Sequence, residues 1–364
     1  MASRSKPIAY IVRRQCSGGG AETAARRLVD HLAPAWEVHR LGAGLNFAGH
    51  VVAGRKGPGW WRALRFAANV DALLDGKPGV TLNLERGPNC SIYRAGDGMH
   101  LRWRALRFGS SAAWMVNPLH WLYPRLEAKT IRSARFVAAN SEMVRREMER
   151  YHPAAAEKVR VILNGFDPDV FYPEVAAPGR RGGELNLPEQ CKLFLFVGSG
   201  WRRKGLARAL ELMAEYNRSL GQDEPLGVLL VVGKGRPEQF KSTLRRLNLE
   251  LELHVRFLGP QTDLRRFYQA ADIFILPTLY DPFSNACLEA MACGCPVMTT
   301  ANNGAAEVIE HGRTGYILDD DPRDAIHWCR TAAVHPAEVV ESVSGWTAAR
   351  ETKAFAALME ECLP

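Results

Sequence analysis

The chain has 364 residues, of which 47% are apolar and 24% charged, and its formal net charge is +8. This length is enough to bury a large core, so we expect two domains. No apolar run approaches the roughly 18 residues of a membrane-spanning helix. The run Ile8–Val12 near the start is too short for a signal-peptide core, which predicts a cytoplasmic protein.

Short apolar or β-branched runs alternate with helical patterns along the chain. In the first half the predicted strands are Ile8–Val12, Val38–Leu41, Thr81–Leu84, Ser91–Tyr93, Phe136–Ala139 and Val161–Leu163, and the predicted helices are Glu22–Leu32, Trp60–Leu74 and Ser141–Tyr151. In the second half the predicted strands are Leu193–Val197, Val228–Val232, Val255–Leu258, Ile273–Leu276, Val297–Thr300 and Tyr316–Leu318, and the predicted helices are Leu206–Leu220, Pro237–Leu247 and Pro322–Ala332. This alternation indicates parallel sheets with both faces covered.

Two such series predict two doubly wound Rossmann-like α/β domains facing across a cleft. The boundary is visible near Asn164–Pro173, and the Pro- and Gly-rich stretch Pro178–Gly183 follows it. We therefore expect an N-terminal domain over residues 1–169 and a C-terminal domain over residues 170–345. The segment Trp346–Leu363 predicts one amphipathic helix, and we assign this helix (346–364) to the N-terminal domain.

Only the N-terminal half of the chain has an excess of positive charge. Residues 1–180 hold 27 Lys and Arg against 15 Asp and Glu, whereas the remaining residues hold 20 against 24. This asymmetry indicates that the N-terminal half faces something anionic, such as an acidic substrate, a membrane surface or nucleic acid. The basic and aromatic stretch Arg102–Phe108 is a candidate contact, and an exposed helix with a packed stripe is its plainer interpretation.

Two loops of the second half offer groups for an anionic ligand. Gly198–Gly205 is a glycine-containing turn with three cations at the mouth of a helix, which suits a phosphate, although it lacks the Walker pattern of nucleotide triphosphatases. The segment after Ile273–Leu276 carries Asp281 and, eight positions on, Glu289. The first carboxylate would lie in the loop and the second within the helix, so both could accept hydrogen bonds from the hydroxyls of one sugar.

Asp281-x7-Glu289, followed by Ala-Met-Ala-Cys-Gly-Cys-Pro-Val, resembles the E-x7-E region of family 4 glycosyltransferases, which are retaining enzymes of the GT-B fold. Other motifs agree in order along the chain: Gly18-Gly19-Gly20-Ala21-Glu22, Asn164-Gly165-Phe166-Asp167, Phe171-Tyr172-Pro173, Lys204-Gly205, Phe257-Leu258-Gly259, Ala271-Asp272 and Asn303–Ile309. The resemblance therefore covers nearly the whole chain.

The resemblance implies that the C-terminal domain holds a nucleotide diphosphate sugar. Arg203 and Lys204 would neutralise the charge that grows on the leaving diphosphate. The implied donor-binding residues are Glu289 for the ribose, Asp281 with Phe283, Ser284 and Asn285 for the sugar, Gly233 and Leu258 for the base, Ser199 beside the diphosphate, and Gly19 and Gly20 in a loop that approaches it closely.

Two positions depart from the family pattern. Asp281 is one methylene shorter than the usual glutamate, and Ser199 stands where an arginine is usual. A serine in that place, with the run Gly-x-x-x-Arg-Arg-Lys-Gly, is similar to the lipopolysaccharide core glucosyltransferase I group. An acceptor rich in phosphorylated heptose would suit the basic N-terminal half.

No general base stands out, but Asp97 and His100 follow an N-terminal strand and are candidates. Asp319-Asp320-Asp321 mimics a metal-binding DxD motif, yet it precedes Pro322 at a helix start, where acidic residues favour the helix dipole. The eight cysteines are scattered without a CxxC pair, which indicates free thiols. We therefore expect no metal and no cofactor.

The resulting hypothesis is a retaining, metal-independent hexosyltransferase that moves glucose from UDP-glucose to a lipid-linked saccharide such as the lipopolysaccharide core. Its expected partners are the nucleotide sugar, that acceptor and an anionic membrane surface, and it would work peripherally at the inner face of the cytoplasmic membrane, without nucleic acid. The alternatives are another GT-B enzyme, either a sugar-nucleotide epimerase or a phosphorylase, and a non-enzymatic basic protein that binds membranes or nucleic acid.

Overall fold

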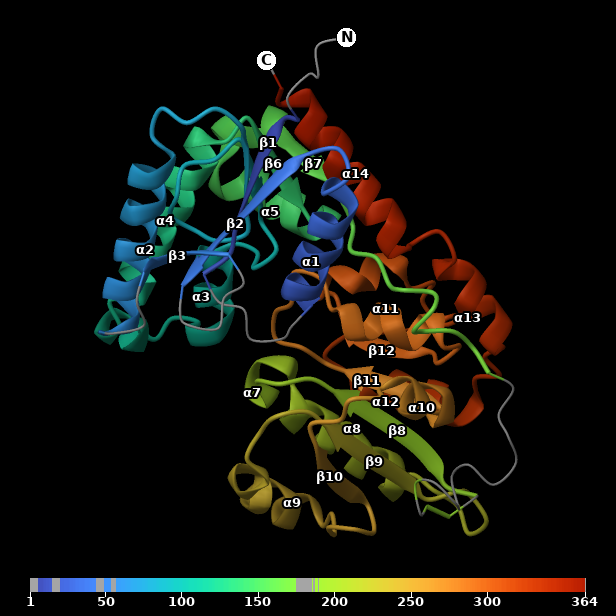
Figure 1. The fold of residues 1–364 in the computed structure, drawn as a ribbon. Coiled ribbons are helices and arrows are strands. Elements are labelled where there is room, and N and C mark those ends of the chain that lie inside the picture. The colour runs from blue at the N-terminus through green and yellow to red at the C-terminus, as the bar shows by residue number, and fades with distance from the viewer. Residues whose placement is uncertain are drawn as a thin grey trace. The chain divides into compact units, whose positions relative to one another are not determined.

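The computed structural model describes residues 6–14, 20–43, 49–53, 57–174, 185, 187–188 and 190–363. It divides into two compact α/β units, shown as ribbons in Figure 1. Unit 1 comprises residues 1–164 and 348–364, and unit 2 comprises residues 165–347. The sequence pattern placed these divisions at 169/170 and 345/346.

Unit 1 is built on a parallel sheet of seven strands in the order β3-β2-β1-β4-β5-β6-β7. The strands are β1 (Ile8–Val12), β2 (Glu37–Ala43), β3 (His50–Ala53), β4 (Val80–Asn83), β5 (Ile92–Arg94), β6 (Phe136–Ala139) and β7 (Val159–Val161). The α-helices are α1 (Gly20–Leu32), α2 (Gly59–Leu74), α3 (His100–Phe108), α4 (Leu119–Ser133), α5 (Glu142–Tyr151) and α14 (Ala348–Glu361), and the 3-10 helices are η1 (Ala112–Val116) and η2 (Pro153–Lys158).

Apolar side chains cover both faces of this sheet. On one face, Ile11 and Leu82 pack with Leu28 of α1 and Phe355 of α14, in one buried cluster. Figure 1 shows the red C-terminal helix α14 beside the blue α1, and the two helices are in contact. The last helix of the chain therefore completes the core of the first unit.

Unit 2 has a parallel sheet of six strands in the order β10-β9-β8-β11-β12-β13. The strands are β8 (Lys192–Val197), β9 (Gly227–Val232), β10 (Val255–Gly259), β11 (Ile273–Leu276), β12 (Val297–Thr300) and β13 (Gly315–Leu318). The α-helices are α7 (Trp201–Lys204), α8 (Leu206–Arg218), α9 (Lys241–Leu247), α10 (Arg265–Ala270), α11 (Asn285–Ala292), α12 (Pro322–Thr331) and α13 (Pro336–Val343), with 3-10 helices η3 (Pro237–Phe240) and η4 (Gly304–Val308). The apolar runs of β9 and β11 are buried at every position, as expected of strands covered on both faces.

Every strand expected from the sequence is present, and four of them have the predicted bounds: β1, β6, β11 and β12. The predicted helix over Pro237–Leu247 is wrong in one respect, because it divides into η3 and α9 at Phe240. The last predicted strand of the first half lies two residues earlier, at β7, and β3 is additional. β3 escapes the pattern because it is short and one of its two valines, Val51, is 55% exposed.

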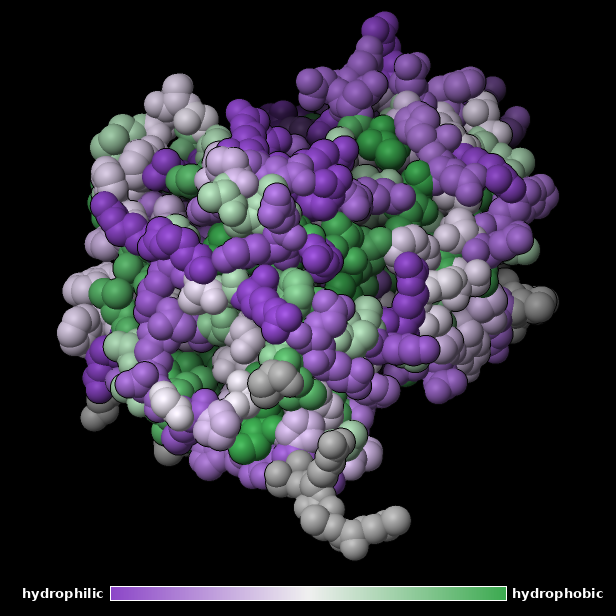
Figure 2. Space-filling view, turned by 90° about the horizontal axis from the view of Figure 1, so that it is seen from above, coloured by the Kyte–Doolittle hydropathy of each residue, from purple (hydrophilic) through white to green (hydrophobic). Residues whose placement is uncertain are grey.

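The surface seen in Figure 2 is mostly hydrophilic, with hydrophobic side chains gathered in a few places between the polar ones. Among the described residues, no helix is both long and apolar enough to span a bilayer.

Candidate functional site

The chain reverses its direction of strand addition in unit 2 between β8 and β11. These strands are neighbours, but β9 and β10 follow β8 on one side, whereas β12 and β13 follow β11 on the other. Loops at the carboxyl ends of two such strands diverge, and the space between them is where open α/β sheets bind ligands. The segment after β8, which includes the short helix α7, carries Arg203 and Lys204, and the loop after β11 carries Asp281.

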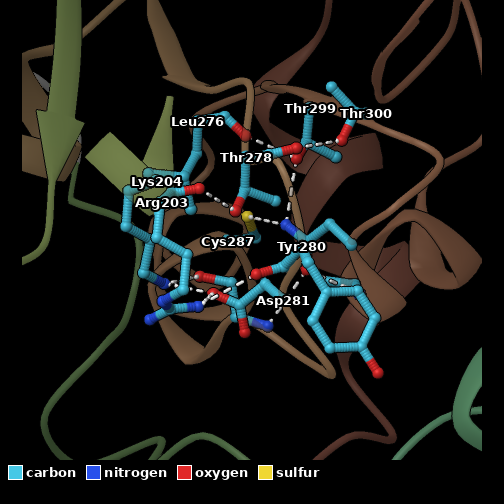
Figure 3. Close-up of polar contacts among 12 residues, drawn as sticks. Arg203, Lys204, Leu276, Thr278, Tyr280, Asp281, Cys287, Thr299 and Thr300 are labelled. Carbon is cyan, nitrogen blue, oxygen red and sulfur yellow. Dashed lines mark hydrogen bonds and ion pairs between the residues drawn. The ribbon is translucent and has the colours of Figure 1, made fainter. Parts of the chain in front are cut away.

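Asp281 is buried, and both cations point at it (Figure 3). The Nζ of Lys204 forms an ion pair with Oδ2 of Asp281, and Nη1 of Arg203 lies 3.2 Å from the same oxygen. Burial acts to raise the pKa of Asp281, but the charges of Lys204 and Arg203 outweigh it and leave that pKa lowered. The carboxyl group is therefore ionised and holds two cations at the switch point.

Backbone contacts lock the two loops together. Leu279 N and the Thr278 hydroxyl each donate to the carbonyl of Arg203 at 2.9 Å. Gly205 has φ +83°, and a Cβ there would lie 1.9 Å from the carbonyl oxygen of Pro277, so only glycine allows this approach. The geometry of the Lys204 and Asp281 pair is thus fixed by main chain on both sides.

Helix α11 begins at this pair. Ser284 stands at the N-cap position in an extended conformation, and its Oγ accepts a hydrogen bond from Nζ of Lys204 at 3.3 Å instead of from the backbone of the helix. The Asn303 side chain accepts hydrogen bonds from the backbone N–H groups of Ser284 and Ala305, which ties the start of α11 to the loop after β12. Phe283 and Asn285 flank Ser284, so the structure brings this predicted group together with Asp281 and the cations.

Glu289 lies in the second turn of α11. Its Oε2 accepts a hydrogen bond from the hydroxyl of Tyr268 at 3.1 Å. Tyr268 is fully buried, and burial together with Glu289 raises its pKa, so it stays a neutral donor. Glu289 itself is half-buried, which leaves its carboxylate within reach of solvent.

The ends of β8, β9 and β10 form the other predicted group. The Ser199 hydroxyl accepts a hydrogen bond from Lys234 N at 3.3 Å, and Gly233 N donates to the carbonyl of Gly259. Gly233 has φ +129°, and a Cβ there would lie 2.2 Å from the carbonyl oxygen of Gly198. Leu258 is half-buried in the same row of strand ends, so the predicted base-binding turns share one edge of the sheet.

Asp97 and His100 lie in unit 1, and their environments differ. Asp97 is about half exposed, with its carboxylate 3.7 Å from Arg86. His100 is buried, and its Nε2 shares a hydrogen bond of 3.0 Å with Nδ1 of His120. Burial and the neighbouring Arg86 lower the pKa of His100 to about 4, so the imidazole is neutral near pH 7.

A buried carboxylate, that of Glu127, holds the loop that carries Asp97. Glu127 is fully buried, and its Oε2 accepts from Nε of Arg86 at 2.8 Å and from His100 N at 3.2 Å. Burial acts to raise its pKa, but His152 and Arg86 outweigh that effect and leave it lowered. Arg86 in turn donates to the carbonyls of Asp97 and Gly98. Asp97 is therefore presented on a rigid loop.

The sequence interpretation missed a charged cluster at the strand reversal of unit 1, between β1 and β4. Arg13 and Arg14 follow β1, and Glu85 follows β4; Nη1 of Arg13 lies 3.6 Å from Oε1 of Glu85, and Arg14 N donates to that oxygen at 3.2 Å. Burial raises the pKa of Glu85 despite both arginines. The sequence signal that could have identified this cluster is the pair Arg13-Arg14 directly after the first predicted strand.

The prediction that Gly19 and Gly20 lie near the diphosphate stays a prediction. Gly20 is the first residue of α1, and Gly19 lies outside the described residues. In the acidic run before α12, Asp321 is the helix cap: its Oδ1 accepts from Arg323 N. Within the described part of the chain, no group of three or more His, Cys, Asp or Glu side chains is arranged to hold a metal ion.

Comparison with protein families matches both halves of the chain. Residues 183–329 match the model described as "Glycosyl transferases group 1", and residues 99–170 match "Glycosyltransferase Family 4". The first match spans the loops that carry Lys204, Asp281 and Glu289, and the second spans His100 and Glu127.

Curated relatives match over part of their length. The chain is 31% identical to alpha-maltose-1-phosphate synthase of Mycolicibacterium smegmatis, over 55% of this chain and 52% of that protein. It is 28% identical to lipopolysaccharide glucosyltransferase WaaG of Escherichia coli, over 47% of this chain and 45% of that protein. The matched region thus spans about half the length of these relatives.

Solved structures match the whole fold. The crystal structure of WaaG, a glycosyltransferase involved in lipopolysaccharide biosynthesis, superimposes with a TM-score of 0.76 at 20% identity, over 97% of this chain and 98% of that one. Anabaena Alr3699/HepE in complex with UDP-glucose gives 0.72 at 17% identity, over 97% and 99%. At these identities the likeness establishes the fold, two doubly wound α/β units as predicted.

Proposed function

The chain resembles the family 4 glycosyltransferases of the GT-B fold along nearly its full length, and on that premise we propose that it transfers a hexose from a nucleotide diphosphate sugar to a saccharide acceptor. The observation that carries this proposal is the pair of cations, Arg203 and Lys204, held by buried Asp281 at the strand reversal of unit 2. Fixed cations at a ligand-binding edge suit a diphosphate.

Arg203 and Lys204 act when the bond between the sugar and the diphosphate of the donor breaks. The bond between the anomeric carbon and the diphosphate oxygen cleaves, and the diphosphate keeps the electron pair. Lys204 and Arg203 stabilise that growing negative charge without moving, because Asp281 and the main chain already hold Lys204 in place. Two side-chain cations supply charge stabilisation of the kind that a bound metal supplies in other enzymes. The proposed reaction is therefore metal-independent.

The acceptor hydroxyl attacks the anomeric carbon on the face that the diphosphate leaves, so the configuration is retained. Its proton passes to the departing phosphate oxygen, which removes the need for a protein base. Asp97 remains the better-placed side chain for an acceptor hydroxyl, because it is exposed on a rigid loop, whereas His100 is buried against His120.

The remaining donor contacts come from residues at the same edge of unit 2. Glu289 accepts from the ribose hydroxyls, and the backbone of Phe283, Ser284 and Asn285 holds the sugar beside Asp281. The turns at Gly233 and Leu258 line the base, with Ser199 next to the diphosphate.

We take glucose from UDP-glucose as the donor and a lipid-linked saccharide of the lipopolysaccharide-core type as the acceptor. The similarity to the lipopolysaccharide glucosyltransferase WaaG and to HepE in complex with UDP-glucose supports these choices. Arg13 and Arg14 give unit 1 a pair of cations for an anionic acceptor group. Such an enzyme works at the cytoplasmic face of the membrane that carries its acceptor.

The test starts with a thermal-shift panel of UDP, GDP and ADP sugars, because a ligand at 100 times its dissociation constant adds about 2.7 kcal/mol of stability. The nucleotide sugar that stabilises the protein is then incubated with and without saccharide acceptors. We expect UDP-glucose to bind and to be consumed in the presence of acceptor. Interconversion of the sugar without acceptor would indicate an epimerase instead, and no binding to any nucleotide sugar would refute the proposal.

A further inference from the structure

The side chain of Asn303 is buried in unit 2, and each end of its amide makes two hydrogen bonds. Its Oδ1 accepts from the backbone N–H groups of Ser284 and Ala305, each at 3.1 Å. Its Nδ2 donates to Oγ1 of Thr299 at 2.9 Å and to Sγ of Cys287 at 3.3 Å. Because two backbone N–H donors can only be met by the oxygen, the neighbours fix the orientation of the amide.

The two ends of this amide reach different parts of the fold. The donor end is tied to the sheet, because the hydroxyl of Thr299, in β12, donates to the carbonyl of Leu276, in β11, at 2.7 Å (Figure 3). The acceptor end reaches two helix starts, with Ala305 in the first turn of η4 and Ser284 directly before α11. Asn303 therefore connects the strands of unit 2 to the start of α11.

Ser284 has the N-cap position of α11, but its side chain makes no capping hydrogen bond with the helix. A serine in this position ordinarily accepts a hydrogen bond from a backbone N–H of the first helical turn. In this structure its Oγ accepts from Nζ of Lys204 at 3.3 Å, while its own backbone N–H is bound to Asn303. The backbone of Ser284 is thus held by Asn303 while its hydroxyl is turned to Lys204.

The ammonium group of Lys204 carries three N–H donors. Within the described part of the chain, the acceptors of its Nζ are Oδ2 of Asp281 and Oγ of Ser284. The side chain is only 13% exposed, so these two acceptors determine the direction of the third N–H. A donor whose direction is set before the reaction is what a developing oxyanion requires. Ser284 is therefore one of two residues that direct Lys204.

We propose that Asn303 is a positioning residue of the donor site, which keeps the hydroxyl of Ser284 on Lys204 and so directs the third N–H of Lys204 at the diphosphate. The inference rests on the proposed function, because it takes a nucleotide diphosphate as the ligand of Lys204. When the bond from Ser284 N to Asn303 is lost, the serine hydroxyl is able to turn to the N–H groups of α11 as an ordinary cap. Lys204 then keeps only Asp281 as a fixed acceptor.

Two substitutions at position 303 separate the contact with Ser284 from the rest of the network. Asn303→Ser keeps an acceptor for Ala305 N, since serine is a common helix cap, but its hydroxyl is one bond shorter and leaves the N–H of Ser284. Asn303→Asp keeps an oxygen for both N–H groups, and the hydroxyl of Thr299 is able to turn its hydrogen to the second oxygen. The two variants therefore differ chiefly in their hold on Ser284.

Asn303→Ser should lower turnover of the nucleotide sugar by at least about tenfold, because a misdirected donor stabilises the leaving diphosphate less. Its affinity for UDP, measured by isothermal titration, should fall by only about threefold, as for one weakened hydrogen bond in the ground state. Asn303→Asp should stay within about threefold of the wild type in both measurements, since it keeps the acceptor for Ser284. Equal losses in the two variants would overturn the inference.

A double-mutant cycle with Lys204→Ala tests whether Asn303 acts through Lys204. If it does, Asn303→Ser should cost less than about twofold further, in turnover and in UDP affinity, once Lys204 is absent. Thr299→Val is the matched control, because it removes a contact from the donor end of the same amide. It should lower stability towards urea but leave turnover within about twofold. An additive loss in the Lys204→Ala background, or a loss in Thr299→Val as large as in Asn303→Ser, would mean that Asn303 only supports the fold.

Binding of UDP separates this inference from the proposed function. A wild type that binds UDP but consumes no nucleotide sugar with any acceptor would refute the proposed function. The cycle of UDP affinities then decides the inference alone: it stands if Asn303→Ser weakens UDP only while Lys204 is present, and it is overturned if the weakening is the same in both backgrounds. A wild type that binds no UDP would overturn both.

Discussion

Lys204 and Asp281 are 77 positions apart in the chain and form a buried ion pair at the point where the sheet of unit 2 reverses. The segment that carries Lys204 and the loop that carries Asp281 are joined by hydrogen bonds, because Leu279 N and the Thr278 hydroxyl both donate to the carbonyl of Arg203. Removing one member of such a pair leaves a buried charge without its partner. The pair therefore contributes to the stability of the fold as well as to the proposed ligand site.

We predict that Lys204→Ala lowers turnover of the nucleotide sugar by roughly 10² to 10³, because a preorganised cation is lost from the leaving diphosphate. Donor affinity should fall less than turnover. The rate of nucleoside diphosphate release, followed at several donor concentrations, measures both turnover and the apparent donor affinity. Lys241→Ala, which removes an exposed lysine of α9, serves as the control and should turn over normally. Normal turnover of a folded Lys204→Ala would remove this residue from the mechanism.

Asp281→Asn should cut activity by at least about tenfold while the fold persists, because the amide keeps the shape of the carboxylate but has no negative charge with which to form ion pairs with Lys204 and Arg203 or to strengthen a hydrogen bond from the sugar. Steady-state kinetics and circular dichroism check the two halves of this statement. Asp320→Asn changes an exposed carboxylate of the acidic run and should leave the kinetics unchanged. A loss of activity in Asp320→Asn would point to a metal site there.

Glu289→Gln should mainly raise the apparent donor constant, by about tenfold, since a ribose hydroxyl would lose an ionised acceptor. The glutamine oxygen can still accept from Tyr268, so the buried hydroxyl keeps its partner. Isothermal titration with UDP measures the change directly. Unaltered UDP binding would place the ribose elsewhere.

The parallel α/β alternation and the place of Asp281 and Glu289 at a strand-to-helix transition followed from the sequence, because buried parallel strands are continuous apolar runs and the loop after such a run lies at the binding edge. The partner of Asp281 did not follow. The sequence assigned Lys204 to the diphosphate and Asp281 to the sugar, and only the three-dimensional arrangement shows that they bind each other. Pairing across 77 positions depends on how two loops pack, which periodicity does not encode.

The loop that carries Asp97 also shows that the sequence pattern does not encode tertiary packing. Its sequence offered two titratable residues three positions apart, and both were candidates for an acceptor base. The fold separates them, because His100 begins α3 and turns inward to His120, whereas Asp97 stays at the surface. Burial of one side chain in such a loop depends on distant residues, in this case Glu127 and Arg86.

His100 predicts a dependence of stability on pH. Its pKa falls from an ordinary 6.5 to about 4 in the native state, so between these values the unfolded chain binds a proton that the native protein does not. Stability should therefore be complete above pH 6.5 and decline as the pH falls toward 4, with a contribution of about 1 to 2 kcal/mol lost by pH 5. Urea unfolding at pH 7 and pH 5 measures it.

His100→Asn has no imidazole to protonate at this position, so its stability should change less between the two pH values than that of the wild type. The exposed His327 on α12 is the matched control, and His327→Asn should keep the wild-type difference. Equal pH dependence in His100→Asn and the wild type would assign the acid sensitivity to other groups.

The last prediction concerns the main chain that holds Lys204 beside Asp281. Gly205 and Gly312 have nearly the same backbone conformation, with φ of +83° and +82°, but a Cβ at Gly205 would lie 1.9 Å from the carbonyl of Pro277, whereas a Cβ at Gly312 meets nothing within 4 Å. Gly312→Ala should thus cost only the strain of the left-handed conformation, roughly 1 to 2 kcal/mol. Gly205→Ala should cost clearly more and also reduce turnover, because the loop after β8 must move away from the loop after β11. Urea unfolding and nucleotide-sugar turnover of both variants test this prediction. Equal destabilisation of the two variants and normal turnover of Gly205→Ala would mean that the close approach of Gly205 to Pro277 does not position Lys204.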